Sequence, residues 1–162
     1  MRPRSPIHRQ EVWMRRYLLL AAIFTAAFGG TAVAGMERFL WEKRPLVMTV
    51  PRADNAAYGQ QLEVVANHAE GFAERDMVVI AVVGDERVEV DGRLAADLNG
   101  GDIRRRLNLP QTRFEVVLVG KDGAVKRRST QAIPANVLFQ TIDAMPMRQR
   151  EMRRSGDGKP DD

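Results

Sequence analysis

Few residues in this chain could do chemistry, and the first constraint is a missing residue type. The 162-residue sequence contains no cysteine. A thiolate nucleophile, a disulfide and a cysteine-based metal site are therefore excluded, and with them thiol-dependent oxidoreductase activity. His68 is the only histidine beyond residue 34, so one chain cannot offer a histidine pair to a metal. We predict no cofactor and no metal site.

The first candidate site is the segment from Pro51 to Asn55, between a predicted strand and a predicted helix. Free N–H groups at a helix start attract anions, and Arg52 would add positive charge. Asp54 and Asn55 are candidates for the helix N-cap. The segment predicts a small anionic ligand at Arg52, Asp54 and Asn55. The alternatives are a solvated Arg52 and a purely capping Asp54, and His68 is either a boundary side chain or a catalytic group.

The second candidate site lies near the C-terminus. Met145 and Met147 flank Pro146, and Arg148 and Arg150 follow. Flexible methionines beside a kink, next to arginines, could form an adaptable surface for a partner protein. The alternative is a core-packing Met145 followed by a basic helix end that complements the helix dipole.

Two further polar clusters have ordinary interpretations. Asp97, Asn99 and Asp102 offer oxygen ligands, but their spacing does not match a calcium loop and no Glu closes it. Asp102 is predicted to cap a short helix over residues 102–108, with residues 104–106, three arginines, mostly outward. Anion binding by these arginines is the alternative.

The positive charge of the chain is concentrated near its start. The formal net charge is +4, and the residues before 35 include Arg2, Arg4, Arg9, Arg15 and Arg16 but only one acid, Glu11. The remainder has equal numbers of basic and acidic residues. A nucleic-acid-binding protein carries its basic excess on its folded part, so we expect no nucleic-acid partner.

Residues 1–34 have the pattern of an export signal. Arg15-Arg16 precede an apolar run over 18–28, and Ala32-Val33-Ala34 fits a signal peptidase. The run of about 11 residues is shorter than the roughly 20 that span a bilayer. We predict cleavage after Ala34 and a periplasmic or secreted protein. An uncleaved signal anchor, which would be the sole membrane contact, is the alternative.

Two features of this leader stay open. Residues 15–19 partly resemble a twin-arginine motif, but Met14 replaces the usual Ser or Thr, which favours the general secretory route. Met14 could also be the true start in place of Met1, because the basic pair and apolar run that follow it already make a complete signal peptide.

The rest of the chain alternates between predicted strands and helices. A lead-in segment, 35–44, should dock Phe39, Leu40 or Trp41 on the domain, with membrane-surface contact as the alternative. Apolar runs and turn residues then predict strands at 45–51 and 77–83, helices at 56–74 and 102–108, a hairpin at 114–126 and a last helix from 133 that Pro146 interrupts. In the first helix, Leu62, Val65, Ala69 and Phe72 share one face. Residues 155–162 should be disordered.

This order of elements predicts the fold class. A strand–helix–strand crossover implies parallel pairing, and Asp122-Gly123 adds an antiparallel neighbour. The unbroken apolar run 116–119 predicts helices on both faces of the sheet. We therefore expect an α/β, thioredoxin-like domain over 45–154, with a central four-stranded mixed sheet.

Two stretches also resemble the signatures of a known family. They are Phe114–Lys126 and Ile142–Met152, and Arg75-Asp76 fits as well. Residues 45–154 are similar to the domain of unknown function 4174 family, found in exported bacterial proteins and in animal sushi-repeat and coiled-coil extracellular matrix proteins. The resemblance implies a fold like that of thioredoxins and peroxiredoxins, and no established activity.

The chain departs from thioredoxins where their chemistry takes place. The segment 51–56 has no sulfur where thioredoxins carry their cysteines, and Pro110 lies too far before Phe114 to match their cis-proline. We therefore expect a non-catalytic binding or interaction module, whose partner is an envelope protein or a small anionic ligand. An enzyme of non-thiol chemistry using the cleft at Pro51–Asn55 is the alternative.

Overall fold

The computed structural model describes residues 35–157, so the predicted leader and the residues from 158 onward lie outside the described residues. Within the described range, no helix has the length and apolar character that crossing a membrane requires. The elements in chain order are η1 (Met36–Phe39), β1 (Arg44–Val50), α2 (Ala56–Asn67), α3 (Ala69–Glu74), β2 (Met77–Val83), β3 (Arg87–Val90), β4 (Arg93–Leu94), α4 (Gly100–Leu107), β5 (Glu115–Val119), β6 (Val125–Ser129), α5 (Ala135–Asp143) and α6 (Pro146–Asp157).

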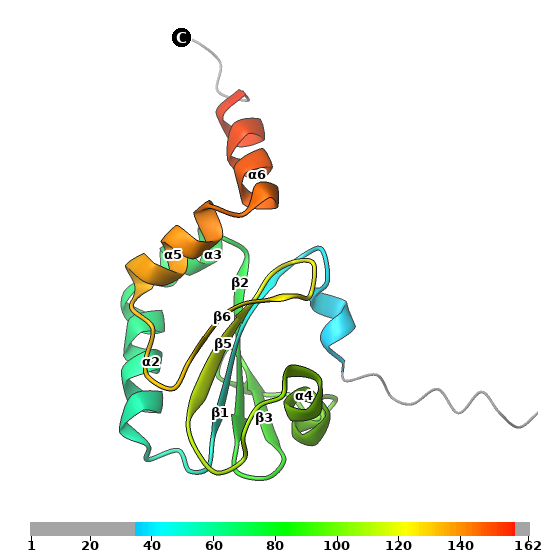
Figure 1. The fold of residues 1–162 in the computed structure, drawn as a ribbon, viewed down its shortest axis with the longest axis vertical. Helices are drawn as coiled ribbons and strands as arrows, with labels where there is room; N and C mark the ends of the chain where they lie inside the picture. The colour runs from blue at the N-terminus through cyan, green and yellow to red at the C-terminus, as the bar shows by residue number, and fades with distance from the viewer. Residues whose placement is uncertain (1–34, 158–162) are drawn as a thin grey trace, which may run out of the picture. The chain divides into compact units, whose positions relative to one another are not determined.

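A mixed sheet with β1 near its centre organises the domain (Figure 1). The strand order is β4-β3-β2-β1-β5-β6. β1 pairs in parallel with β2 and antiparallel with β5, and β6 returns antiparallel to β5. The four strands β2-β1-β5-β6, with β5 alone reversed and the α2–α3 crossover between β1 and β2, form the predicted thioredoxin-like core.

The sheet has six strands, so the predicted count of four is too low. The alternating residues 88–90 pair with β2, and a turn at Asp91-Gly92 brings back the two-residue strand β4. Both turn residues have positive φ, 47° and 74°, which Asp and Gly tolerate better than other residues. The hairpin signal was therefore present in the sequence but too short to be assigned to the sheet.

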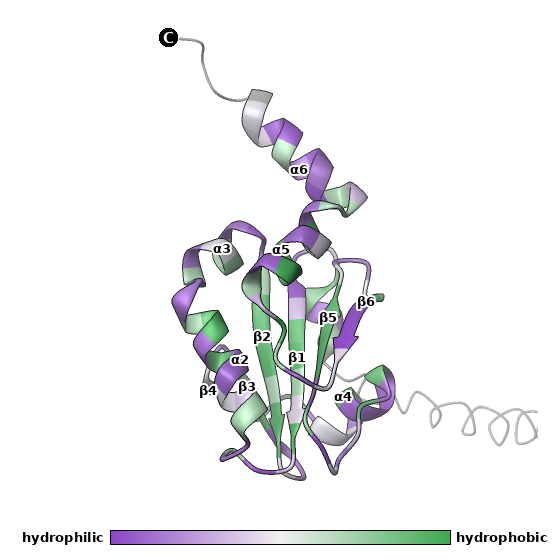
Figure 2. Cartoon of the chain, turned by 60° about the vertical axis from the view of Figure 1, so that its left-hand side comes forward, coloured by the Kyte–Doolittle hydropathy of each residue, from purple (hydrophilic) through white to green (hydrophobic). Residues whose placement is uncertain are grey.

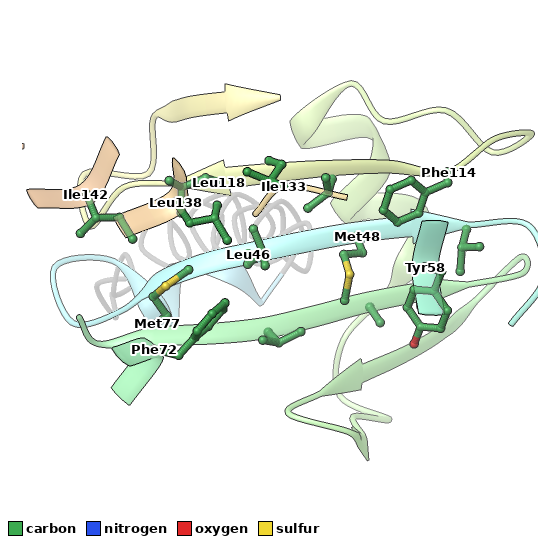
Figure 3. Close-up of a cluster of buried hydrophobic side chains, with 14 residues drawn as sticks. Leu46, Met48, Tyr58, Phe72, Met77, Phe114, Leu118, Ile133, Leu138 and Ile142 are labelled. Carbon is green, nitrogen blue, oxygen red and sulfur yellow. The ribbon is translucent and has the colours of Figure 1, made fainter. Parts of the chain in front are cut away.

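Helices cover both faces of the sheet, as the apolar run at 116–119 predicts. On one face, Leu46, Met48 and Leu118 pack under α2, α3 and α5 (Figure 3). On the other face, Val47 and Val117 pack under η1 and α4. Figure 2 shows that the central strands are largely hydrophobic, whereas α6 is mostly hydrophilic.

The predicted helix 56–74 is two helices, and its buried face differs from the predicted one. The break lies at His68, whose backbone (φ −132°, ψ 29°) is not helical. Tyr58 and Gln61 are buried, whereas Leu62 is 39% exposed and Ala69 is exposed. Gln61 is buried because its amide bonds both backbone polar groups of Ile133, its N–H at 2.7 Å and its carbonyl at 3.2 Å. A polar side chain thus takes a core position that apolar periodicity cannot identify.

Helix α4 also begins earlier than predicted, and one of its arginines points inward. Asn99, not Asp102, is the N-cap, accepting a hydrogen bond from the Asp102 N–H at 2.9 Å. Arg104 is only 7% exposed. Its guanidinium donates to the Thr49 hydroxyl and to the carbonyls of Gly84 and Asp85, which satisfies it inside the domain. Burial lowers the pKa of Arg104 from its ordinary value.

The second candidate site lies at the junction of α5 and α6. Pro146 separates α5 from α6, as predicted. α6 then continues to Asp157, so residues 155–157, predicted to be disordered, are helical.

In the lead-in segment, Phe39 is buried against the domain while Trp41 is 68% exposed.

Candidate functional site

The two predicted sites lie at opposite ends of β1. Pro51–Asn55 follows the last residue of β1, and residues 145–150 lie beside its first residue, Arg44. A seven-residue strand rises about 3.3 Å per residue, so the two regions are about 20 Å apart. Each must therefore be judged as a separate site.

The segment at the start of α2 is exposed and internally neutralised. Arg52 and Asp54 form an ion pair at 3.1 Å, with side chains 80% and 69% exposed. The hydrogen bond from Arg52, followed by its charge, lowers the pKa of Asp54. Asn55 is the N-cap of α2 and accepts from the Tyr58 N–H at 3.2 Å. Hollows lie beside η1 and beside β4, and neither is lined by these three residues.

His68 lies at the opposite end of α2 from that segment, at the C-cap of the helix. Its ring Nδ1 lies 2.9 Å from the Val64 carbonyl, and the residue is exposed. The ring meets Phe139 edge-on at 6.3 Å between centroids. These contacts are those of a boundary histidine at a helix break.

At the second site, the predicted residues divide between the inside and the outside of the domain. Met145 and Met147 are half-buried, and Arg148 is 7% exposed. Arg150 is exposed. The interior position of Arg148 means that its guanidinium holds the fold together, whereas Arg150 faces solvent on α6.

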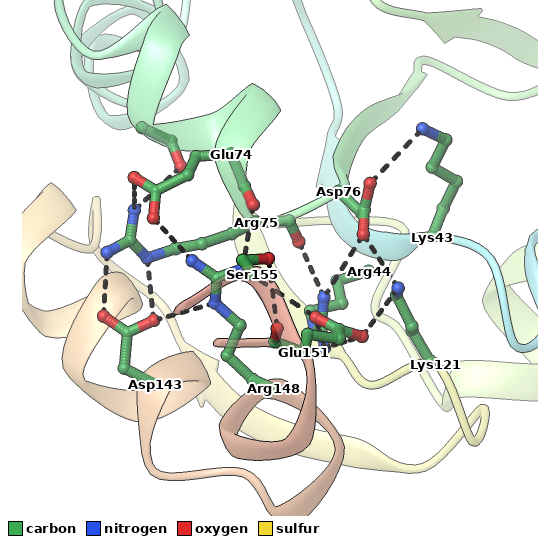
Figure 4. Close-up of polar contacts among 11 residues, drawn as sticks. Lys43, Arg44, Glu74, Arg75, Asp76, Lys121, Asp143, Arg148, Glu151 and Ser155 are labelled. Atoms are coloured by element: carbon green, nitrogen blue, oxygen red, sulfur yellow. Dashed lines mark hydrogen bonds and ion pairs between the residues drawn. The ribbon is translucent and has the colours of Figure 1, made fainter. Parts of the chain in front are cut away.

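Arg148 belongs to a network of charged side chains that joins α6 to the rest of the domain (Figure 4). It donates to the Glu74 carbonyl at 3.0 Å and to the Glu74 carboxylate at 2.6 Å. It also lies 3.4 Å from Asp143, whose carboxylate receives two hydrogen bonds from Arg75 at 3.0 and 2.8 Å. This half of the network ties α6 and α5 to the end of α3.

The other half ties α6 to the sheet. Arg44, 1% exposed, donates to both oxygens of Glu151 at 3.0 Å. Lys121 donates to Glu151 and to Asp76, each at 2.8 Å. Both Arg44 hydrogen bonds come from one nitrogen, Nη2, and hydrogen bonds between ionised groups are about twice as strong as those between neutral groups. Arg44 Nε is the one buried side-chain nitrogen or oxygen in residues 35–157 without a hydrogen-bond partner.

The directions of their pKa shifts indicate that the carboxylates of the network are ionised. Burial alone would raise the pKa of Glu151, but hydrogen bonds from Lys121 and Arg44 outweigh burial, so the pKa is lowered. The pKa values of Asp76 and Asp143 are lowered in the same way, by Lys121 and by Arg75 respectively. The carboxylates are thus held ionised against fixed cations. Such a cluster stabilises structure and is poorly suited to proton transfer.

The outer face of α6 has the opposite character. Arg150, Arg153 and Arg154 lie at i, i+3 and i+4, so they share one face of the helix, and all three are exposed. No ion pair within residues 35–156 involves any of them. In that same part of the chain, no group of three or more His, Cys, Asp and Glu side chains could hold a metal ion.

Comparison with known proteins gives the family. Residues 35–151 match the model described as Domain of unknown function (DUF4174). The chain belongs to the DUF4174 family. The match begins ten residues before the predicted start at 45 and ends three before 154.

The relatives are larger proteins. Human "Sushi repeat-containing protein SRPX" is 31% identical over 126 residues, covering 75% of this chain and 27% of that protein. "Coiled-coil domain-containing protein 80" from Danio rerio is 29% identical over 133 residues, covering 72% of this chain and 15% of that protein. The chain thus spans about a quarter or less of the length of these relatives. Among solved structures, Plasmodium yoelii Prx1a aligns with a TM-score of 0.48 and 14% identity, covering 77% of this chain and 83% of that one.

The stretches that resemble DUF4174 signatures meet in the charged network. Lys121 comes from the first, Asp143, Arg148 and Glu151 from the second, and Asp76 from the Arg75-Asp76 pair. Sequence reasoning identified these segments but not that they converge, because the residues that join them in the network lie 30 to 74 positions apart. It missed Arg44 altogether, since nothing in a Lys-Arg-Pro sequence marks an arginine as buried.

Proposed function

We propose that this DUF4174 protein is an exported, cysteine-free, thioredoxin-like domain that acts as a non-catalytic interaction module. It binds an acidic partner protein outside the cytoplasm through the outer face of α6. The leader pattern of residues 1–34 supports export. We favour the partner protein over the small anionic ligand at Pro51–Asn55 because Arg52 is already paired with Asp54.

One observation carries the proposal: α6 presents a cluster of exposed arginines on a fixed base. Arg150, Arg153 and Arg154 are exposed and have no acidic partner within residues 35–156, whereas Arg52 is already paired with Asp54. The inner face of α6 is anchored by Arg148 and Glu151. A helix held in place loses less entropy on binding than a flexible basic tail, so its arginines are prepared to meet carboxylates.

The chemistry available in the described residues supports a binding role over an enzymatic one. A general acid or base needs a titratable group that is free to exchange a proton with a substrate. Asp54 is paired with Arg52, and the network carboxylates face fixed cations. Nucleophilic thiol chemistry is excluded by the lack of cysteine.

The test compares two triple variants of the full chain with the same change in charge. In the first, Arg150, Arg153 and Arg154 become Gln; in the second, the exposed residues Arg52, Arg93 and Arg127 become Gln. Both are used to capture proteins from an envelope fraction at two salt concentrations, with quantitative mass spectrometry. We expect a specific acidic protein to be retained by wild type and by the second variant and lost by the first.

The opposite outcomes overturn the proposal. Equal retention by both variants means that α6 is not the binding surface. Loss in the second variant alone, reproduced by Arg52→Ala, moves the site to the start of α2 and restores the anionic-ligand interpretation. Catalytic turnover by metal-free protein on an envelope substrate would favour the enzyme alternative.

A further inference from the structure

Trp41 is an exposed aromatic residue held in a backbone conformation that suits glycine. Its φ is 67°, in the left-handed region, which bulky residues adopt rarely and at a cost. Its side chain does not repay that cost by packing, because the residue is 68% exposed. Within residues 35–157, neither an aromatic pair nor a cation–π contact involves its ring. The fold therefore gains little from tryptophan at this position.

The backbone on either side of Trp41 is firmly fixed. The Trp41 N–H donates to the Lys121 carbonyl at 2.7 Å, and the Lys43 N–H donates to the Phe39 carbonyl at 2.9 Å. Phe39 and Arg44, two and three residues away, are buried. The indole ring is thus held outward by a rigid support. A strained residue of this kind that the core does not use is a candidate for function.

Trp41 stands at the same end of the domain as α6. The residue whose carbonyl holds Trp41, Lys121, donates through its ammonium group to Glu151 of α6 at 2.8 Å. Arg44, three residues after Trp41, donates to the same carboxylate. Figure 4 shows Lys43 reaching Asp76, which also meets Lys121, and Lys121 reaching Glu151. The Trp41 backbone and the inner face of α6 are thus held by the same residue, Lys121.

We propose that Trp41 is the apolar anchor of the surface that α6 presents, and that the partner is a protein segment combining acidic side chains with an exposed apolar one. Trp and Arg are the residues most enriched among those that dominate binding energy at protein interfaces. This inference rests on the proposed function and specifies the chemistry of its partner. An anionic membrane is a poorer fit, because α6 uses its inner face for ion pairs and offers no apolar stripe that could enter a bilayer.

The experiment follows the fluorescence of Trp41. The sequence has two tryptophans, and Trp13 lies in the predicted leader, so the chain that begins at Gly35 after cleavage has Trp41 as its sole indole reporter. The probes are a helical peptide of glutamates with leucine at every fourth position, the same peptide with each leucine replaced by Gln, and phosphatidylglycerol vesicles. We expect the leucine peptide alone to shift the emission to shorter wavelength.

Substitution of Trp41 then separates binding from folding. Trp41→Gly suits the positive φ, so the melting temperature should stay within a few degrees, while affinity for the leucine peptide, measured by titration calorimetry because this variant has no indole reporter, falls at least tenfold. A large loss of stability would make Trp41 a structural residue and overturn the inference. Three other results would also overturn it. They are an unchanged peptide affinity in Trp41→Gly, no emission shift with the leucine peptide, and an emission shift with the vesicles. The capture experiment with Arg150, Arg153 and Arg154 tests the proposed function independently of these results.

Discussion

Glu151→Gln should destabilise the domain, because it removes a carboxylate that accepts hydrogen bonds from both Arg44 and Lys121. Arg44 is 1% exposed, and both of its contacts with Glu151 are 3.0 Å long. Glutamine keeps the shape and one acceptor oxygen but turns its NH₂ group toward a cation. Arg44 would retain the Arg75 carbonyl at 2.9 Å and Asp76 at 3.9 Å.

The size of the effect follows from these contacts. Removing one partner of a buried ion pair costs about 3 to 5 kcal/mol. The Glu151 side chain is 28% exposed, and Asp76 still balances Lys121, so we expect the lower end of that range, about 3 kcal/mol. For a domain of this size that corresponds to a fall in melting temperature of about 12 °C.

The assay is urea unfolding of wild type and Glu151→Gln, with Glu63→Gln as the matched control. Glu63 is an exposed residue of α2, so its substitution should change the free energy of unfolding by less than about 0.5 kcal/mol. Relative to wild type, Glu151→Gln should also increase the rate of hydrogen exchange more in α6 than in β1, since α6 loses its attachment first. If Glu151→Gln is no more harmful than Glu63→Gln, the network does not hold α6 and the rigid-helix argument fails.

Three further predictions use the same structure. Because the pKa of Glu151 is lowered in the folded state, the stability it contributes is present above the ordinary carboxyl pKa and is lost as pH falls through the lowered value; thermal melts from pH 7 to pH 3 should therefore show a steeper acid loss in wild type than in Glu151→Gln. Val117→Asp or Val79→Asp places an unpaired charge in the core and should abolish cooperative unfolding by circular dichroism; a soluble variant with unchanged melting temperature would contradict the burial of these strands. Asn55→Ala removes the cap of α2 and should cost about 1 kcal/mol in urea unfolding, and an unchanged midpoint would show that the Tyr58 N–H finds another acceptor.

Much of the fold could be predicted because its strands and turns have local signals. The apolar runs at 46–50, 77–83 and 116–119 are buried strands, and the turn at Lys121-Asp122-Gly123 has the expected positive φ of 75° at Gly123. Pro146 stops a helix because it lacks an N–H. Each of these features depends on a few neighbouring residues, which a sequence displays directly.

The features that sequence reasoning missed depend on distant partners. Gln61 is buried because Ile133, 72 residues later, meets both ends of its amide. Arg104 points inward because Gly84 and Asp85 offer carbonyls there. For the candidate sites, the sequence predicted a partner surface at Met145, Met147, Arg148 and Arg150. It could not divide them into an inner Arg148 and an outer Arg150, since that division is set by Glu74 and Asp143.

The spread of the charged network along the chain has a consequence for the order of folding. Its members run from Arg44 to Glu151, so the network cannot close until nearly all of the described chain has been synthesised. Contacts between residues this far apart form late, after the cost of closing the intervening loop has been met. Glu151→Gln should therefore leave the refolding rate nearly unchanged and accelerate unfolding. The attachment of α6 would then determine the lifetime of the folded domain.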